Sequence, residues 1–148
     1  MTLTEAEQAF LAQQRHARLA TIGRDGFPQV KPVGFSYNAE LGTIDVAGFN
    51  MAASAKYKNV QANPKMAFVA DDEPRPGDAA AGVRFLEIRG VAEMATASPA
   101  PGDEGHLAPE IIRVRPRRVL GFNIDPDRPG LQTRETGGTP VHNARWPA

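Results

Sequence analysis

The chain has 148 residues, in which 17 Lys and Arg balance 17 Asp and Glu, and it contains no cysteine. This length fits one domain with one sizeable core, and the absent cysteine excludes disulfides, thiolate metal sites and Cys nucleophiles. A net charge of zero argues against a nucleic-acid partner. No apolar run reaches the roughly 18–20 residues that span a bilayer, and the N-terminus lacks a secretory signal, so the sequence predicts a cytoplasmic protein without a membrane partner.

The first part of the chain reads as a helix followed by strands. Thr4 and Glu7 are spaced as a capping box, which predicts a short helix over residues 5–15. Arg24-Asp25-Gly26 is typical of a hairpin turn, because Gly can adopt a positive φ. Alternating polar and apolar residues predict strands at residues 18–22, 27–37 and 43–47.

The second part begins with a helix over about residues 53–62, which Asn63-Pro64 ends. The apolar run Met66–Ala70 predicts a strand that is buried on both faces. Gly90 is a candidate for a bulge or corner within its strand. Further strands are expected at residues 83–95, 111–115 and 119–124, the last two joined by a turn at 116–118.

About six strands with short antiparallel connections and short helices indicate a mainly β (α+β) protein, a small barrel rather than a βαβ sheet. We expect a barrel domain over residues 1–124 and an extended C-terminal tail over 125–148. The three histidines are scattered along the sequence without a metal-ligand spacing, so no metal site is predicted.

The segment 47–64 carries the strongest functional signal. Ala47 and Gly48 end a strand, and Ser54, Lys56 and Lys58 follow at the start of a helix. Backbone N–H groups, a hydroxyl and ammonium groups in that order are suited to a phosphate. Ser54 could equally be the N-cap, and Lys58 lies on a different helix face from Lys56.

Several motifs in the same order resemble a known family. They are Arg18-Leu19-Ala20-Thr21-Ile22, Asp25-Gly26-Phe27-Pro28, Pro32-Val33-Gly34-Phe35, the Ser54-Ala55-Lys56 helix start, Arg84–Gly90 and Ile112–Val119. Over about residues 4–124 the chain resembles the pyridoxamine 5′-phosphate oxidase-like split β-barrel superfamily. Within it, the sequence is most similar to an actinobacterial branch described as probably dependent on coenzyme F-420, an 8-hydroxy-5-deazaflavin.

The sequence departs from the true oxidases of that superfamily at informative positions. The oxidases carry Ser-Arg-Lys at the helix start, whereas this chain has Ala55 in place of the Arg. Phe85 replaces a Gln that contacts the flavin ring, and Glu87 replaces an Arg. These changes count against tight FMN binding and against vitamin B6 chemistry.

The resemblance implies a set of cofactor-binding residues. Lys56 and Ser54 would hold the phosphate, Lys58 an anionic tail, Ala47 and Gly48 would flank the phosphoribityl-like chain, and Arg84 would reach the cofactor across a dimer interface. The ring would lie against the strand formed by Gln29, Val30, Lys31, Pro32 and Val33. Arg113, Arg115, Arg117 and Arg118 are candidates for a polyglutamyl tail or for structural roles.

The implied function is that of a homodimeric oxidoreductase that binds coenzyme F-420 at the subunit interface and transfers a hydride to an unsaturated small-molecule acceptor. The cofactor carries this chemistry, so no catalytic side chain is predicted, and Tyr37, Tyr57 and His16 are equal candidates for a proton donor. The alternatives are an FMN-dependent reductase of the same fold and a non-catalytic carrier of a flavin, a deazaflavin or a tetrapyrrole-like ligand.

Overall fold

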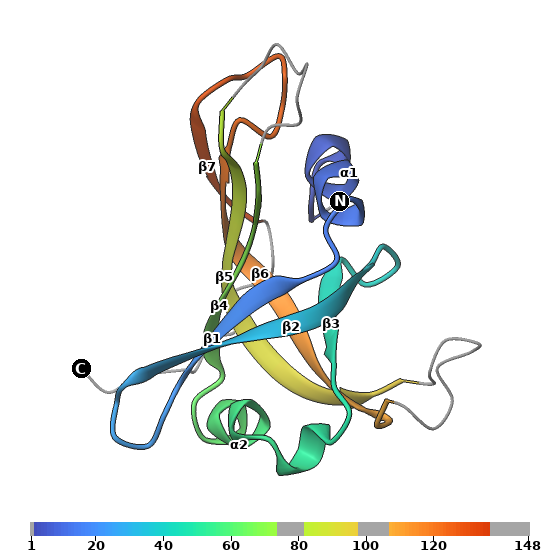
Figure 1. Cartoon of the computed structure of the whole chain (residues 1–148), viewed down its shortest axis with the longest axis vertical. Helices are drawn as coiled ribbons and strands as arrows, with labels where there is room; N and C mark the ends of the chain where they lie inside the picture. Colours follow the sequence, from blue (N-terminus) through green and yellow to red (C-terminus); the bar gives the residue numbers. More distant parts are fainter. Residues whose placement is uncertain (1, 74–81, 98–106, 137–148) are drawn as a thin grey trace.

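A computed structural model describes residues 2–73, 82–97 and 107–136. Within them, seven antiparallel strands are arranged in the order β3-β2-β1-β4-β5-β6-β7, and an additional β3–β6 pairing closes the first six into a barrel (Figure 1). The strands are β1 (Ala17–Ile22), β2 (Pro28–Asn38), β3 (Thr43–Ala47), β4 (Lys65–Asp72), β5 (Arg84–Thr96), β6 (Glu110–Phe122) and β7 (Leu131–Glu135). The predicted mainly β split barrel of about six antiparallel strands is confirmed.

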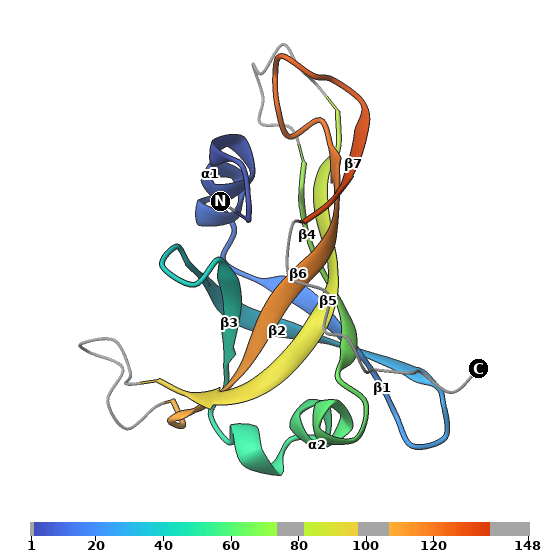
Figure 2. The ribbon, with the colours of Figure 1, turned by 180° about the vertical axis from the view of Figure 1, so that it is seen from behind.

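Short helices lie at the two ends of the barrel. Helix α1 (Glu5–Ala12) lies near one end, while the 3-10 helix η1 (Met51–Ala53) and helix α2 (Ala55–Ala62) lie at the other (Figures 1 and 2). The predicted capping box of α1 is confirmed: the Glu7 amide donates to Thr4 Oγ1 at 3.2 Å, and the Thr4 amide donates to Glu7 Oε2 at 2.9 Å. The helix ends at Ala12, earlier than expected.

The core fills the interior of the barrel with aliphatic and aromatic side chains from every strand of the closed barrel. Phe68 on β4 is fully buried, and its ring meets the Phe35 ring edge-on with centroids 5.0 Å apart. Buried core residues include Leu3, Phe10, Leu11, Leu19, Ile44, Val46, Val60, Leu86, Ile88, Ile112, Val114 and Val119. Because α1 and α2 each contribute to this list, the helices are fixed to the ends of the barrel by apolar packing.

The expectation that β4 is buried on both faces is wrong. Met66, Phe68 and Ala70 point into the core, whereas Ala67 and Val69 are only partly buried on the outer face. Burial therefore alternates along the strand, as it does in a barrel with one inner and one outer face. The continuous apolar run means instead that this part of the outer face is also apolar.

The expectation of two late strands joined by a turn at residues 116–118 is also wrong. β6 runs without interruption from Glu110 to Phe122. Pro116, which suggested a turn, lies opposite Gly90 where the register of β5 and β6 shifts, so the predicted bulge at Gly90 is confirmed. A proline is tolerated at such a position because the ladder is already interrupted there.

Residues beyond 124 also contribute to the sheet. Arg118 to Phe122 of β6 pair with Leu131 to Glu135, so β7 extends the sheet by one edge strand beyond the closed barrel. Residues 137–148 of the predicted tail lie outside the described residues. No helix among the residues that the structure describes combines the length and apolar character needed to cross a bilayer.

Candidate functional site

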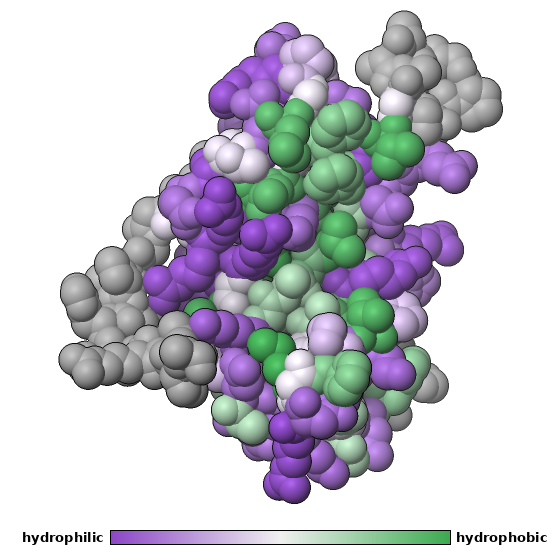
Figure 3. Space-filling model, turned by 90° about the vertical axis from the view of Figure 1, so that its left-hand side faces the viewer, coloured by the Kyte–Doolittle hydropathy of each residue, from purple (hydrophilic) through white to green (hydrophobic). Residues whose placement is uncertain are grey.

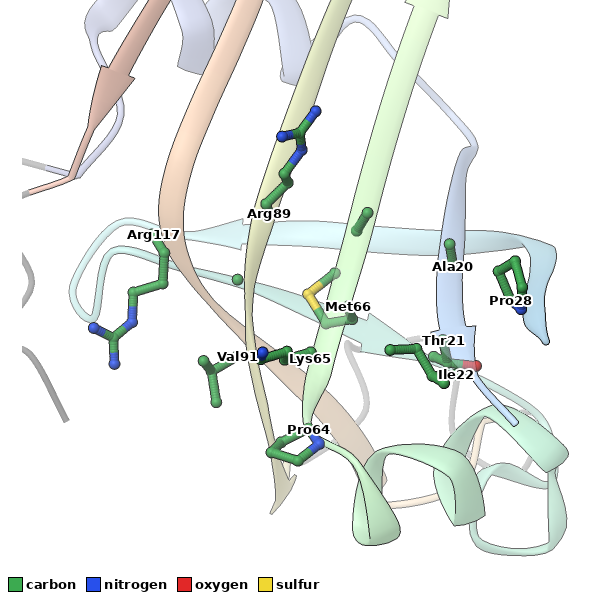
Figure 4. Close-up of a pocket in the computed structure, with 12 residues that line it drawn as sticks. Ala20, Thr21, Ile22, Pro28, Pro64, Lys65, Met66, Arg89, Val91 and Arg117 are labelled. Carbon is green, nitrogen blue, oxygen red and sulfur yellow. The ribbon is translucent and has the colours of Figure 1, made fainter. Parts of the chain in front are cut away.

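One prominent feature of the described surface is a wedge between β1 and β4. These strands pair only from Arg18 to Ala20, opposite Val69 to Ala67, and then separate toward the β1–β2 hairpin. The gap is an apolar cavity of about 660 Å³, a volume typical of small-molecule sites. Ile22 and Pro28 form one wall, and Met66 and Val91 form the other (Figure 4).

Basic side chains lie at the rim of this cavity. Lys65, Arg89 and Arg117 contribute to its lining from β4, β5 and β6 (Figure 4). Glu87 accepts two hydrogen bonds from Arg89, at 2.9 and 3.2 Å, and this carboxylate raises the pKa of the Arg89 guanidinium. The cavity thus has an apolar interior, which suits a planar ring system, and basic residues in its lining, of which Arg89 is already paired with Glu87.

The predicted ring-binding residues lie along β2, and the strand places their side chains on alternate sides. Val30 and Pro32 share the outer face with Ala20 and Arg18, their partners on β1. Gln29 and Lys31 point to the other side, as does Val33, whose side chain is buried in the core. Side chains of all five residues therefore cannot reach one ligand, and Val33 could contribute only main-chain groups.

The same segment of β2 has an unpaired main-chain edge. β2 pairs with β3 only from Gly34 to Asn38, so the described strands leave residues 28–33 without a partner on the side away from β1. Alternate N–H and C=O groups of an edge strand are available for hydrogen bonding. A ring with polar atoms at its edge could bind there.

Ala47 and Gly48 lie where β3 ends beside this edge. Ala47 is the last β3 residue paired with β2, opposite Gly34. The Gly48 carbonyl accepts a hydrogen bond from the Ala108 amide at 3.0 Å, which anchors the turn that follows. The two residues therefore lie next to the free edge of β2.

Ser54 is the N-cap of α2, so that prediction is confirmed. Its hydroxyl oxygen accepts from the Tyr57 amide at 3.3 Å and donates to the Met51 carbonyl at 2.6 Å. Ser54 thus links η1 to α2 and fixes the direction in which α2 starts. The hydroxyl therefore already accepts one hydrogen bond from the main chain and donates one to it.

Lys56 and Lys58 differ in their surroundings, although both lie early in α2. Lys56 is half-buried, and no hydrogen bond or ion pair joins its ammonium group to another described residue. Lys58 is exposed and points in another direction, since residues two positions apart do not share a helix face. A lysine that is half-buried and has no protein partner for its ammonium group is suited to an anionic ligand near the start of a helix.

Arg84 is the first residue of β5, whereas the cavity is lined by the middle of that strand. Its guanidinium forms an ion pair with Asp72, donates to Gln13 Oε1 at 3.2 Å and lies 4.9 Å from the centroid of the Phe10 ring. Six strand residues, or about 20 Å, separate it from Gly90 at the cavity. Within one chain the structure does not bring Arg84 together with Lys56.

Several arginines of β6 have acidic partners. Arg113 binds Asp45, Arg115 binds Glu93 and Arg118 binds Glu135. These pairs favour the structural role that the sequence left open for them over a role as ligands for an anionic tail. Among the residues that the structure describes, no group of three or more His, Asp and Glu side chains could hold a metal ion.

The sequence interpretation missed Asn59 and Thr21, which connect α2 to the β1–β2 hairpin. Asn59 Nδ2 donates to Thr21 Oγ1 at 3.0 Å and to Gln29 Oε1 at 2.9 Å. Asn59 lies three positions after Lys56 and therefore on the same side of α2. The spacing of Lys56 and Asn59 is visible in the sequence, but the hydrogen-bond partners of Asn59 depend on how the hairpin packs against the helix.

Comparisons with known proteins agree with this arrangement. The family model described as pyridoxamine 5′-phosphate oxidase matches residues 3–125. A 5a,11a-dehydrotetracycline/5a,11a-dehydrooxytetracycline reductase of Streptomyces rimosus is 40% identical over 129 residues, which cover 86% of this chain and 87% of that protein. The family match spans the closed barrel and the segment from the end of β3 to α2.

Two solved structures show the same fold. A conserved hypothetical protein of Mycobacterium tuberculosis superposes with a TM-score of 0.65 at 22% identity, covering 93% of this chain and 94% of its own. An F-420 reductase superposes with a TM-score of 0.55 at 26% identity, covering 77% of this chain and 95% of its own. From the matched residues and the shared barrel, we conclude that this chain belongs to the pyridoxamine 5′-phosphate oxidase family of split-barrel proteins and is an oxidoreductase.

Proposed function

We propose that this protein is a homodimeric reductase that binds the deazaflavin coenzyme F-420 at the subunit interface and uses it to reduce an unsaturated organic acceptor. The observation that carries the proposal is Lys56, a half-buried residue at the start of α2 whose ammonium group has no partner among the described residues. It lies on the same side of α2 as Asn59, whose amide contacts Gln29 on the free-edged segment of β2. A phosphate at Lys56 and a ring against β2 would then be bound together.

The residues present fit a deazaflavin better than FMN. Position 55, where the oxidases have an Arg, is an exposed Ala, so one cation rather than two faces the phosphate. Phe85, at the position of the ring-contacting Gln, is stacked on Phe122 with centroids 5.6 Å apart. A cofactor whose affinity is spread over a longer anionic chain depends less on two cations at one phosphate.

The proposed dimer would cover an apolar outer face. Val30 is 62% exposed, and Ala67, Val69 and Phe85 line a shallow depression beside it. Figure 3, viewed from the side toward which the β1–β2 hairpin extends, shows a band of hydrophobic side chains between hydrophilic ones. A second copy of the chain on this face would bury the band and exclude water from the cavity between β1 and β4.

The proposed acceptor is a fused-ring compound with an electron-poor carbon–carbon double bond. This proposal is supported by the 40% identity to a reductase of dehydrotetracyclines. When bound, the reduced deazaflavin would supply a hydride from C5 to one carbon of the double bond, and a proton from solvent would complete the reduction at the other. The protein would orient the two planar reactants against β2 and keep the cavity dry.

The test is a fluorescence titration of the purified protein with oxidised coenzyme F-420 and, separately, with FMN, alongside measurement of its mass in solution. We expect micromolar or tighter binding of coenzyme F-420, weak binding of FMN and a dimer. A protein that purifies yellow and releases FMN would establish the FMN-dependent alternative. Binding without acceptor-dependent oxidation of the reduced coenzyme, measured with a dehydrotetracycline, would favour a carrier.

A further inference from the structure

Asn59 lies at the junction of three elements that the proposed site depends on. Both hydrogens of its side-chain amide are engaged, because Nδ2 donates to Thr21 Oγ1 at 3.0 Å and to Gln29 Oε1 at 2.9 Å. Thr21 and Gln29 are direct partners across β1 and β2. One side chain of α2 therefore binds both strands of the hairpin at the same level.

At Thr21 and Gln29, the hairpin of β1 and β2 no longer pairs with β4 or β3. The pairing of β1 with β4 ends at Ala20, and the pairing of β2 with β3 ends at Gly34. Residues 21–29 of the hairpin therefore extend from the barrel without a further strand on either side, as the projecting hairpin in Figure 1 shows. The angle between this hairpin and α2 depends on contacts other than the sheet ladder.

The contact made by Asn59 is well placed to fix that angle. Thr21 is only 2% exposed, so its hydrogen bond is shielded from water and costly to lose. Val60, the next residue of α2, is also buried. The amide therefore lies at the edge of the core, where neighbouring side chains limit its rotamers.

We infer that Asn59 is a positioning residue that holds the phosphate-binding turn of α2 and the ring-binding edge of β2 at the spacing of one cofactor. This inference rests on the proposed function. Lys56, one helical turn before Asn59, contacts the phosphate, and Gln29 belongs to the edge that contacts the ring. With the two parts held in register, a cofactor engages both without ordering the hairpin first.

The test compares two ligands that share the ring but differ in the phosphate. The wild-type protein should bind coenzyme F-420 more tightly than the ribityl deazaflavin that lacks the phosphate and the tail. The ratio to follow is the dissociation constant of the ligand without phosphate divided by that of coenzyme F-420. In Asn59→Ala this ratio should shrink about tenfold, since two hydrogen bonds no longer hold the two subsites in register. Affinity for the ligand without phosphate should change little, because that ligand needs only the edge of β2.

Controls separate positioning from general destabilisation. Gln61→Ala removes an exposed amide from the same helix and should leave the ratio unchanged. Thr21→Val removes one of the two acceptors at nearly constant volume, and should reduce the ratio in part while the protein remains folded. Hydrogen exchange at residues 21–33, measured without ligand, should increase in Asn59→Ala and not in Gln61→Ala.

The outcomes distinguish this inference from the proposed function. A wild-type protein that binds neither deazaflavin nor flavin overturns both. If it binds FMN instead, the ratio for FMN and riboflavin tests Asn59 in the same way. A folded Asn59→Ala protein that keeps the wild-type ratio, with Thr21→Val also unchanged, overturns the inference alone.

Discussion

Asp45 on β3 and Arg113 on β6 face each other across the pairing that closes the barrel. Arg113 Nε donates to Asp45 Oδ1 at 3.0 Å and an Arg113 terminal nitrogen donates to Oδ2 at 3.1 Å. The two side chains are only 17% and 14% exposed. Only Ile44, Asp45 and Val46 pair with β6, so this bidentate contact lies in the middle of a short ladder, between residues whose side chains pack in the core.

Arg113→Ala should therefore destabilise the barrel. It would leave the Asp45 carboxylate largely buried without its cation, and we expect the free energy of unfolding to fall by about 2–3 kcal/mol. Arg115→Ala, on the same strand, is the control, because Arg115 and Glu93 are 49% and 43% exposed and such a pair contributes less than about 1 kcal/mol. Urea unfolding of both variants tests this, and equal losses would contradict it.

The same pair predicts how stability depends on acid. Burial by itself would raise the pKa of Asp45, but hydrogen bonds from Arg113 and Asn38 and the charge of Arg113 outweigh it, so the pKa lies below the ordinary 3.8. The unfolded chain then takes up the proton first, so this stabilisation is present above pH 3.8 and is lost as the pH falls through the folded-state value. Asp45→Asn should flatten the acid limb of stability against pH; an unchanged slope would exclude Asp45 as its source.

Sequence patterns predicted the local features well because those depend on neighbouring residues. The Thr4–Glu7 capping box and the Ser54 N-cap need only a few residues of chain, and Gly26 adopts the positive φ, +82°, that its turn requires. The uninterrupted β6 was missed because Pro116 is tolerated only where Gly90 lies opposite it, which is a property of two strands distant in sequence.

The sequence indicated which residues belong to the candidate site, but not the cavity between β1 and β4 or the contacts of Asn59. The motif order identified β2, the end of β3 and α2; in the structure the end of β3 pairs with β2, and Asn59 of α2 binds Gln29 of β2. The wedge between β1 and β4 arises because pairing stops after Ala20, and no residue in either strand marks that point. Asn59 likewise acquires its partners only through folding.

Gly90 and Gly34 differ in the space beside their Cα atoms: Gly90 is crowded by the main chain of β6, whereas Gly34 faces open space that a ligand could occupy. An added Cβ at Gly90 would lie 2.3 Å from the Arg115 carbonyl oxygen, a main-chain atom, so Gly90→Ala should cost about 2–3 kcal/mol of stability. At Gly34 nothing lies within 4 Å, so Gly34→Ala should change stability by less than about 0.5 kcal/mol. Thermal unfolding checks both values. Weaker coenzyme binding by a fully stable Gly34→Ala would indicate that the ligand occupies the space beside Gly34.

Helix α1 and the edge strand β7 are joined by one ion pair. The Glu7 carboxylate accepts from the Thr4 amide within the capping box and also from Arg134 of β7. Arg134→Ala should therefore increase hydrogen exchange in Leu131–Glu135 while the closed barrel stays protected. Glu7→Gln can still accept from the Thr4 amide but loses the charge, so it should loosen β7 with less effect on α1. Unchanged exchange in β7 would mean that its ladder with β6 is sufficient by itself.

Lys56 and Lys58 provide the most direct comparison at the proposed phosphate site. Both are lysines in the first turns of α2, but only Lys56 is half-buried and shares a helix side with Asn59. Lys56→Ala should weaken binding of coenzyme F-420 by about tenfold or more, since it would remove the proposed charge-assisted hydrogen bond to the phosphate. Lys58→Ala should weaken it by less than about threefold, and this small loss should vanish at high salt because exposed charges are screened. Fluorescence titration at two ionic strengths measures both, and equal effects of the two substitutions would remove Lys56 from the phosphate site.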